Sequence, residues 1–198
     1  MDLPTDVDVV VIGAGIVGAS SAYHLAAAGH RVAVLEARAG YAEGSTGRSF
    51  ASVRGQWADD LSIALSWGSI RTYQRFEQEH GIDVGYRPSG YLLLFPEDAW
   101  GRHLEAVELQ RAHGVPVEVL DATAAQRFTP FVVEGVAGAT YGSADGRIDP
   151  HLVTGAYLDL ARAAGASLHL GRPVTDIEAQ PDGSWVCLLY TSPSPRDS

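Results

Sequence analysis

The chain has 198 residues, of which 46% are hydrophobic and 19% are charged. This is the composition of a globular protein, because disordered chains combine few hydrophobic residues with many charges. The 24 acidic side chains outnumber the 14 basic ones and give a net charge of −10, which disfavours a surface built to bind nucleic acid.

Residues 9–30 contain no Asp, Glu, Lys or Arg, and an apolar run of this length could cross a bilayer. Glycines interrupt the run, so a buried strand, a turn and a buried helix are favoured over a membrane span. We expect a strand over 7–12, a helix over 16–28 that ends at Gly29, and a second strand over 32–35. Such a βαβ unit pairs its two strands in parallel through a right-handed crossover.

A polar loop over 39–55 separates this unit from the rest of the chain, in which glycines and prolines punctuate alternating helix and strand patterns. The elements expected there are a helix over 58–80, a strand over 91–95, a helix over 97–113, an edge strand over 117–120, a helix from Pro150 to about 164, and strands over 167–170, 174–179 and 184–186. Asp149 and Pro150 suit the N-cap and first position of their helix.

The glycine motif Gly13-Ala-Gly15-Ile-Val-Gly18 lies between the first strand and the first helix. Gly13 permits a tight turn, Gly15 lets the backbone approach a pyrophosphate, and Gly18 lets helix and strand pack closely. N–H groups at the helix start favour phosphate, and Glu36 at the end of the second strand can accept hydrogen bonds from ribose hydroxyls. The motif predicts an ADP-containing dinucleotide with an unphosphorylated 2′-hydroxyl.

The loop Gly44-Ser45-Thr46-Gly47-Arg48-Ser49 bears on the choice between FAD and NAD. Its two glycines, three hydroxyls and one cation suit a second contact with the pyrophosphate and with the flavin ribityl chain. In a simple NAD dehydrogenase, a third strand follows the second after only a short connection. FAD is therefore favoured, and an NAD-dependent dehydrogenase or a merely solvated linker are the alternatives.

The stretches DVVVIGAGIVGASSAYHLAAAGHRVAVLEA, GSTGRSFASVRGQW and VGYRPSGYLLLF resemble the FAD-dependent amine and amino-acid oxidoreductase family. This family includes D-amino acid, glycine and sarcosine oxidases and dimethylglycine and proline dehydrogenases. The resemblance covers about residues 6–186 and is nearest to members like the sarcosine oxidase β-subunit and proline dehydrogenase. It implies an α/β fold: an FAD-binding, Rossmann-like doubly wound sheet with part of an inserted mixed-sheet substrate domain, truncated at the C-terminus.

The resemblance also implies roles for individual residues. The implied FAD contacts are Gly13, Gly15, Ile16, Gly18, Glu36, Ala37, Arg38, Ser45, Thr46, Arg48 and Val174. Arg54 falls where sarcosine oxidases place the arginine that holds the substrate carboxylate, a task that suits a bidentate guanidinium. The alternative for Arg54 is a surface salt bridge. Dimethylglycine-type members carry a Trp-His pair where this chain has Gly47-Arg48, so the FAD is expected to be non-covalent.

The implied reaction passes a hydride from the carbon beside an amine nitrogen to the flavin, and water hydrolyses the resulting imine. The substrate would be a small amine or amino acid of the sarcosine, glycine, proline or D-amino acid type. A catalytically idle FAD-fold subunit or assembly protein is the alternative from a different class, and partner subunits in a hetero-oligomer are compatible with either. The histidines show no metal-ligand spacing, so no metal site is expected.

The last residues, CLLYTSPSPRDS, resemble the translation of a transposon-type sequencing-library adapter, with an ordinary floppy terminus as the alternative. We expect 187–198 to be such an artefact and the chain to be a truncated piece, insoluble or inactive by itself. The expected division is 1–84 and 142–186 for FAD binding and 85–141 for the substrate domain. The single cysteine, Cys187, excludes a disulfide scaffold and favours the reducing cytoplasm, and the acidic N-terminus does not resemble a secretion signal.

Overall fold

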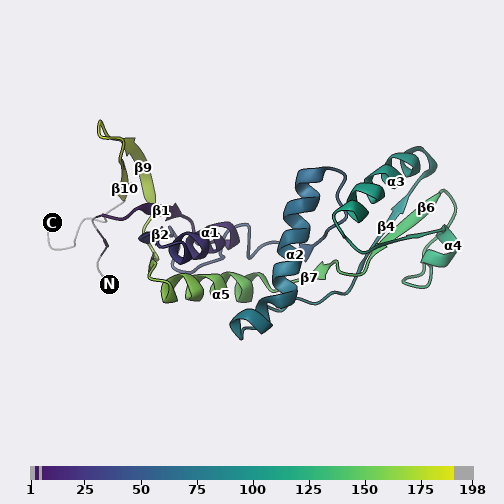
Figure 1. Cartoon of the computed structure of the whole chain (residues 1–198), viewed down its shortest axis with the longest axis horizontal. Coiled ribbons are helices and arrows are strands. Elements are labelled where there is room, and N and C mark those ends of the chain that lie inside the picture. The colour runs from purple at the N-terminus through teal and green to yellow at the C-terminus, as the bar shows by residue number, and fades with distance from the viewer. Residues whose placement is uncertain (1–2, 5, 190–198) are drawn as a thin grey trace, which may run out of the picture. The chain divides into compact units, whose positions relative to one another are not determined.

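The computed structural model describes residues 3–4 and 6–189 and divides into two compact units (Figure 1). The first unit is Met1–Ser49 with Pro150–Ser198, and the second is Phe50–Asp149. This division follows packing alone. The assignment of 1–84 and 142–186 to cofactor binding and of 85–141 to substrate binding concerns function and stays a prediction.

A parallel sheet with strand order β1-β2-β8 lies at the centre of the first unit. Its strands are β1 (Val9–Ile12), β2 (Val32–Leu35) and β8 (Ser167–His169). Every residue of β2 is buried, as expected for the middle strand of a covered parallel sheet. The expected parallel pairing of the first two strands is confirmed, with Val9 opposite Val32.

Helix α1 (Ile16–Ala27) connects β1 to β2 and packs against α5 (Pro150–Ala163). The buried face of α1 consists of Ala19, Ala22 and Ala26, whose small side chains allow the two helices to approach closely. Gly29 follows the helix with a φ of +93°, a conformation that glycine adopts without strain.

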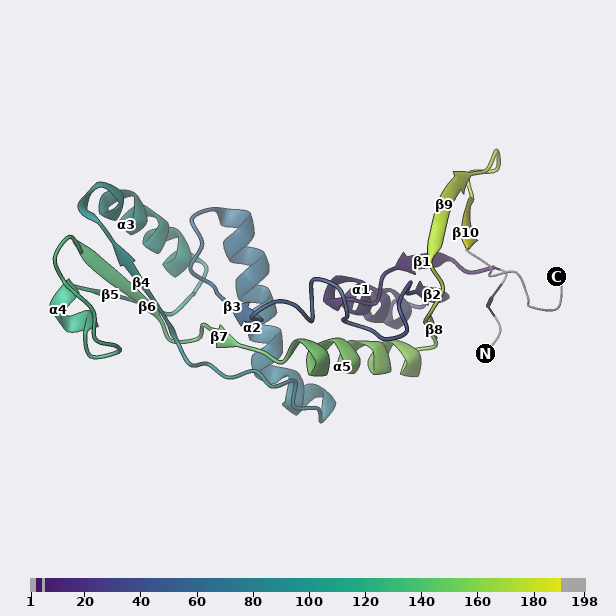
Figure 2. The same ribbon diagram turned by 180° about the vertical axis from the view of Figure 1, so that it is seen from behind.

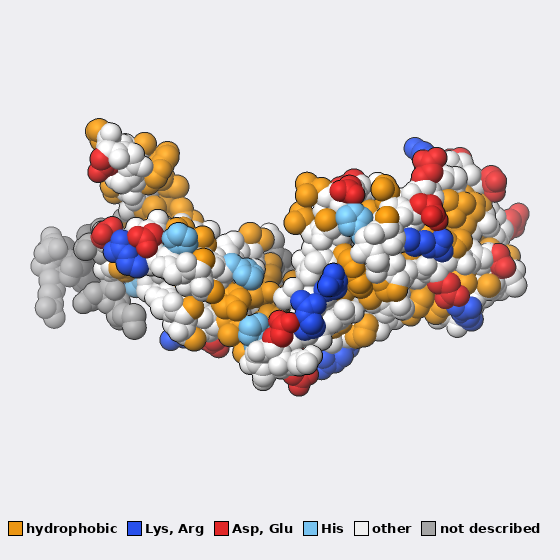
Figure 3. Space-filling model, viewed as in Figure 1, with side chains coloured by type: hydrophobic (Ala, Val, Ile, Leu, Met, Phe, Trp, Pro, Cys, Tyr) orange, Lys and Arg blue, Asp and Glu red, His pale blue; other side chains and the backbone are white. Residues whose placement is uncertain are grey.

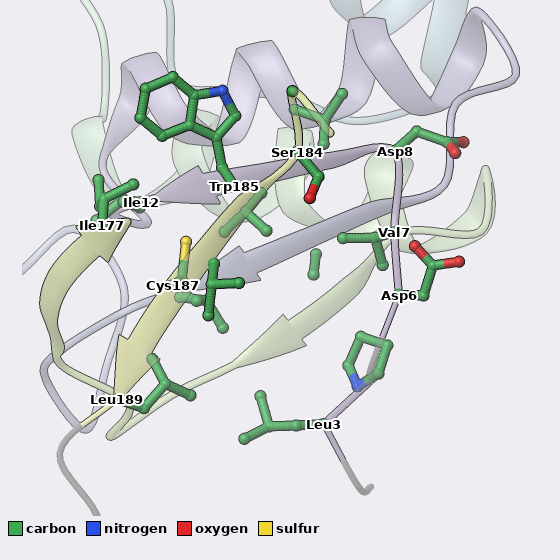
Figure 4. A pocket seen from close by; sticks show the side chains of 17 residues that line it. Leu3, Asp6, Val7, Asp8, Ile12, Ile177, Ser184, Trp185, Cys187 and Leu189 are labelled. Carbon is green, nitrogen blue, oxygen red and sulfur yellow. The ribbon is translucent and has the colours of Figure 1, made fainter. Parts of the chain in front are cut away.

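A β-hairpin lies on the sheet face opposite α1 (Figure 2). It pairs β9 (Val174–Ala179) with β10 (Trp185–Leu189), so the expected strand over 184–186 extends three residues further. Residues 187–189 of the expected artefact segment thus pair with β9, and residues 190–198 lie outside the described part. A cavity of about 730 Å³ separates the hairpin from the sheet, and Figure 4 shows Ile12, Ile177 and Cys187 among its lining residues.

The second unit contains an antiparallel sheet of order β4-β6-β5. The strands are β4 (Tyr91–Phe95), β5 (Val117–Leu120) and β6 (Gly138–Gly142). The expectation that 117–120 is an edge strand is confirmed. The central strand β6 was not predicted, because its sequence GATYG has no apolar alternation and begins with a glycine. The structure shows that the Trp100 ring packs against this glycine.

Helices complete the second unit, together with a short strand pair. They are α2 (Asp60–His80), α3 (Glu97–Ala112) and α4 (Ala122–Ala125), and the strand pair is β3 (Ser52–Val53) with β7 (Gly146–Arg147). The expected helix over 58–80 begins at Asp60, because the carboxylate of Asp59 accepts a hydrogen bond from the Ser62 N–H at 2.8 Å and so caps it. Gly81 ends the helix with a φ of +71°.

On the face of the molecule that Figure 3 shows, acidic and basic side chains are interspersed without a continuous basic patch. Within residues 3–4 and 6–189, none of the helices combines the length and the apolar character that crossing a bilayer requires.

Candidate functional site

The glycine turn between β1 and α1 has no room for larger residues at its closest point. A Cβ on Gly18 would stand 2.0 Å from the carbonyl oxygen of Gly13 and 3.3 Å from a methyl carbon of Val11. Gly13 itself has a φ of +100°, and its N–H donates to the Leu35 carbonyl at 2.8 Å. The helix start is thereby brought against the C-terminal ends of two parallel strands, where α/β proteins bind nucleotides.

The carboxylate of Glu36 points at this turn. Its Oε2 accepts a hydrogen bond from the Ala14 N–H at 2.8 Å, and its Oε1 accepts one from the Arg38 N–H at 2.9 Å. The backbone of Glu36 is fixed as well, because its N–H donates to the His169 carbonyl and its carbonyl accepts from the Arg172 N–H. Each carboxylate oxygen keeps a further lone pair with which it could accept a hydroxyl hydrogen.

The polar loop that follows β2 folds back onto the same turn. Thr46 Oγ1 accepts a hydrogen bond from the Ile16 N–H at 3.1 Å, and the Ala42 N–H donates to the Ala14 carbonyl at 3.0 Å. A Cβ on Gly15 would stand 3.0 Å from Thr46 Oγ1, so a larger residue there would crowd the threonine. The loop for which the sequence predicts a second contact with the cofactor thus lies next to the glycine turn, for which it predicts the first contact.

The N-terminus of α1 suits an anionic ligand such as a pyrophosphate. Its N-cap residue is Gly15, which has no side chain to cap the helix, and the first turn contains no acidic residue. Thr46 satisfies only the N–H of Ile16, and the other N–H groups of a first helical turn have no acceptor within the helix. The positive end of the helix dipole adds to this preference for phosphate.

The other residues that the resemblance implies in FAD binding lie near Glu36 and Thr46, which adjoin the glycine turn, or near Arg172. Ala37, Arg38, Ser45 and Arg48 are exposed next to Glu36 and Thr46 in the chain. Val174 is half-buried at the start of β9, two residues after the Arg172 that bonds the Glu36 backbone. The structure therefore brings Gly13, Gly15, Ile16, Gly18, Glu36 and Thr46 together, while Arg54 belongs to the second unit.

Arg54 lies in the second unit on the segment between β3 and α2. Its guanidinium carbon is 4.1 Å from the centroid of the Trp57 indole, and the Trp57 Nε1–H donates to the Arg54 carbonyl at 2.8 Å. In the described part of the chain no ion pair engages Arg54. The surface salt bridge considered for it from the sequence is therefore absent among these residues.

A buried carboxylate next to this segment was missed by the sequence analysis. Asp145 is fully buried; its Oδ1 accepts from the Gly55 N–H at 2.7 Å and its Oδ2 from Gln56 Nε2 at 2.8 Å. Burial raises the pKa of Asp145, and the hydrogen bonds and the charge of Arg54 oppose that rise. Gly55 and Asp145 are 90 positions apart, so only the fold brings them together.

Within 3–4 and 6–189 no group of three or more His, Cys, Asp or Glu side chains is placed to hold a metal ion.

Comparison with known proteins identifies several similar chains. The chain is 30% identical over 184 residues to dimethylglycine dehydrogenase of Mus musculus, covering 90% of this chain and 21% of that protein. It is 32% identical to 4-methylaminobutanoate oxidase (formaldehyde-forming) of Paenarthrobacter nicotinovorans, over 91% of this chain and 22% of that protein. Glycine oxidase of Bacillus licheniformis is 30% identical, with 87% of this chain and 47% of the oxidase covered.

Among solved structures, L-proline dehydrogenase from P. horikoshii superposes with a TM-score of 0.81 at 29% identity, covering 91% of this chain and 48% of that one. The chain thus spans about a fifth of the dimethylglycine dehydrogenase and about half of the proline dehydrogenase. The α/β fold expected from the resemblance is confirmed. The family model DAO, described as FAD dependent oxidoreductase, matches residues 8–194. The chain belongs to the DAO family of FAD-dependent oxidoreductases.

Proposed function

We propose that this chain forms the FAD-binding part of an enzyme that oxidises the C–N bond of a small amine or amino acid. The observation that carries the proposal is the corner at the start of α1, where Gly18 touches Gly13 and the Glu36 carboxylate faces the turn. Family membership supports FAD over NAD as the dinucleotide.

The residues of the corner fit the cofactor. The N–H groups of the first turn of α1 would bind the pyrophosphate, and Glu36 would accept hydrogen bonds from the ribose hydroxyls. Thr46 keeps the second loop at the same place. When bound, the flavin would supply the redox chemistry by accepting two electrons and a proton from the substrate as hydride.

The substrate class follows from the relatives and from Arg54. Dimethylglycine, 4-methylaminobutanoate, glycine and proline, after which the relatives are named, each combine an amine nitrogen with a carboxylate. A guanidinium binds a carboxylate through two parallel hydrogen bonds and so orients the neighbouring C–N bond. We infer that Arg54 performs this task in the present chain.

The cytoplasm and a hetero-oligomeric assembly also belong to this proposal. With Cys187 set aside as part of the expected artefact, residues 1–186 contain no cysteine, which is compatible with a reducing compartment. Partner subunits are compatible both with the enzyme and with the idle-subunit alternative, in which the fold binds FAD without turning over a substrate.

Anaerobic reduction tests whether the protein is an enzyme. We expect the intact gene product to be yellow and to lose its flavin absorbance when mixed with one of sarcosine, N,N-dimethylglycine, glycine, L-proline or D-alanine. The measurement is an anaerobic spectral titration, with dithionite as the control for complete reduction. A yellow protein that none of these amino acids bleaches would favour the idle subunit, and a colourless protein that binds NAD would favour the dehydrogenase.

Acid precipitation tests the expected non-covalent attachment. In this chain Gly47 has no room for a side chain, because its Cβ would stand 2.2 Å from the Ala42 carbonyl oxygen, and no histidine follows it. We therefore expect trichloroacetic acid to release essentially all flavin into the supernatant. Flavin that stays in the washed pellet would contradict non-covalent attachment.

A further inference from the structure

The segment Arg54–Trp57 is held from several sides by groups that do not belong to it. We propose that Trp57 and Asp145 are positioning residues for Arg54: the indole supports the guanidinium, and the carboxylate fixes the backbone that carries it. This inference rests on the proposed function, because it concerns the arginine that would bind the substrate carboxylate.

Trp57 contacts Arg54 twice. The ring lies beneath the guanidinium at 4.1 Å, a distance at which the ring quadrupole attracts a cation, and the indole N–H binds the Arg54 carbonyl. The backbone of Trp57 is fixed in turn by Gln110, which is fully buried and donates its Nε2–H to the Trp57 carbonyl at 2.7 Å. Stacking on an aromatic face orients a guanidinium while leaving its edge free for a carboxylate.

Asp145 anchors the residues between them. Its two oxygens accept from the Gly55 N–H and from the Gln56 side chain, which also donates to the Tyr91 carbonyl at 2.9 Å. The space is filled, since a Cβ on Gly142 would stand 2.4 Å from Asp145 Oδ2. The backbone of Asp145 is itself attached to the start of β4, because its carbonyl accepts from the Gly90 N–H at 2.8 Å.

The energetics argue for position rather than stability. A fully buried carboxylate loses its hydration, and apolar side chains of similar volume would stabilise a fold as well or better. Here both oxygens of the Asp145 carboxylate accept hydrogen bonds from the two residues that directly follow Arg54. A buried group of this kind fixes one backbone path for the segment, and this path sets the direction in which Arg54 leaves it.

The test compares a carboxylate substrate with its uncharged analogue. In the intact, flavin-loaded protein, KM is measured for the amino acid that bleaches the flavin and for its carboxamide, which lacks the negative charge. We expect Trp57→Leu to raise KM for the acid about 5-fold to 10-fold with kcat nearly unchanged, and to leave KM for the carboxamide as it was. Trp57→Phe, which keeps an aromatic face, should have a KM for the acid close to the wild-type value.

For the anchor, Asp145→Asn replaces one acceptor by an NH₂ group, and we expect KM for the acid to rise about 10-fold. Should that variant fail to fold, Gln56→Met removes the partner instead and should act in the same direction. Gln126→Met is the matched control, because Gln126 also donates to a backbone carbonyl in this unit, that of Phe131 at 2.9 Å. It should leave both KM values unchanged.

The outcomes separate the two proposals. If Arg54→Ala raises KM for the acid but Trp57→Leu and the Asp145 or Gln56 variant do not, the positioning proposal is overturned and the proposed function stands. Equal rises for acid and carboxamide would mean a general structural defect and would overturn it too. If Arg54→Ala itself leaves KM for the acid unchanged, the proposed role of Arg54 fails first.

Discussion

The intact protein with Gly18→Ala is expected to bind FAD at least about 100-fold more weakly than the wild type. The added Cβ would stand 2.0 Å from the carbonyl oxygen of Gly13, which is backbone and cannot rotate away. Relief requires α1 to move off β1, and overpacking of this severity costs about 3 kcal/mol or more. That movement would displace the N–H groups proposed to bind the pyrophosphate.

The measurement is the ratio of flavin to protein after gel filtration, together with circular dichroism to follow the fold. Gly68→Ala is the matched control, because Gly68 lies inside α2 and nothing stands within 4 Å of its added Cβ. Alanine there should stabilise the protein by about 0.5–1 kcal/mol and leave the flavin ratio unchanged. A Gly18→Ala protein with a full complement of FAD would refute the proposed role of the glycine turn.

Arg54→Ala is expected to raise KM for a carboxylate-bearing substrate about 100-fold while the FAD stays bound. The loss follows from removing two charge-assisted hydrogen bonds, each of which is worth about 1.5–3 kcal/mol. The FAD should be retained because the residues proposed to hold it belong to the other compact unit. Steady-state kinetics and the flavin spectrum of the same preparation measure both effects.

Arg127→Ala provides the control for this experiment. Arg127 belongs to the same unit, and its guanidinium also lies over an aromatic ring, that of Phe128 at 4.7 Å, but it pairs with Glu118 on the surface. Its loss should change KM little, because exposed ion pairs contribute little to stability. An unchanged KM in Arg54→Ala would remove Arg54 from the substrate site.

The turn between β1 and α1 could be predicted from the sequence because its signals are local. A β-branched strand, three spaced glycines, an alanine-rich helix and an acid after the second strand all fall within residues 7–36, and each has one physical task. The structure places Gly18 against Gly13 and Glu36 against Ala14. The hydrogen bond from the Ile16 N–H to Thr46 is a finding of the structure, because the sequence predicted only a contact of Thr46 with the cofactor.

The second unit was harder to predict because its important contacts are distant in sequence. Strand β6 pairs on both sides although two of its five residues are glycines. Glycine is required at these two positions because Trp100 and Asp145 leave no space for a larger residue. Asp145 reads as an ordinary turn residue until the fold places it beside Gly55 and Gln56. Periodicity and capping rules describe neighbours along the chain and contain no information on such a pair.

An experimental structure of the intact protein with its cofactor tests the central claim most directly. We predict that the pyrophosphate oxygens lie within hydrogen-bond distance of N–H groups in the first turn of α1. We also predict that the adenosine ribose hydroxyls donate to the carboxylate of Glu36. A diphosphate bound elsewhere, or a Glu36 side chain turned away from the sugar, would contradict the account of this chain as an FAD-binding unit.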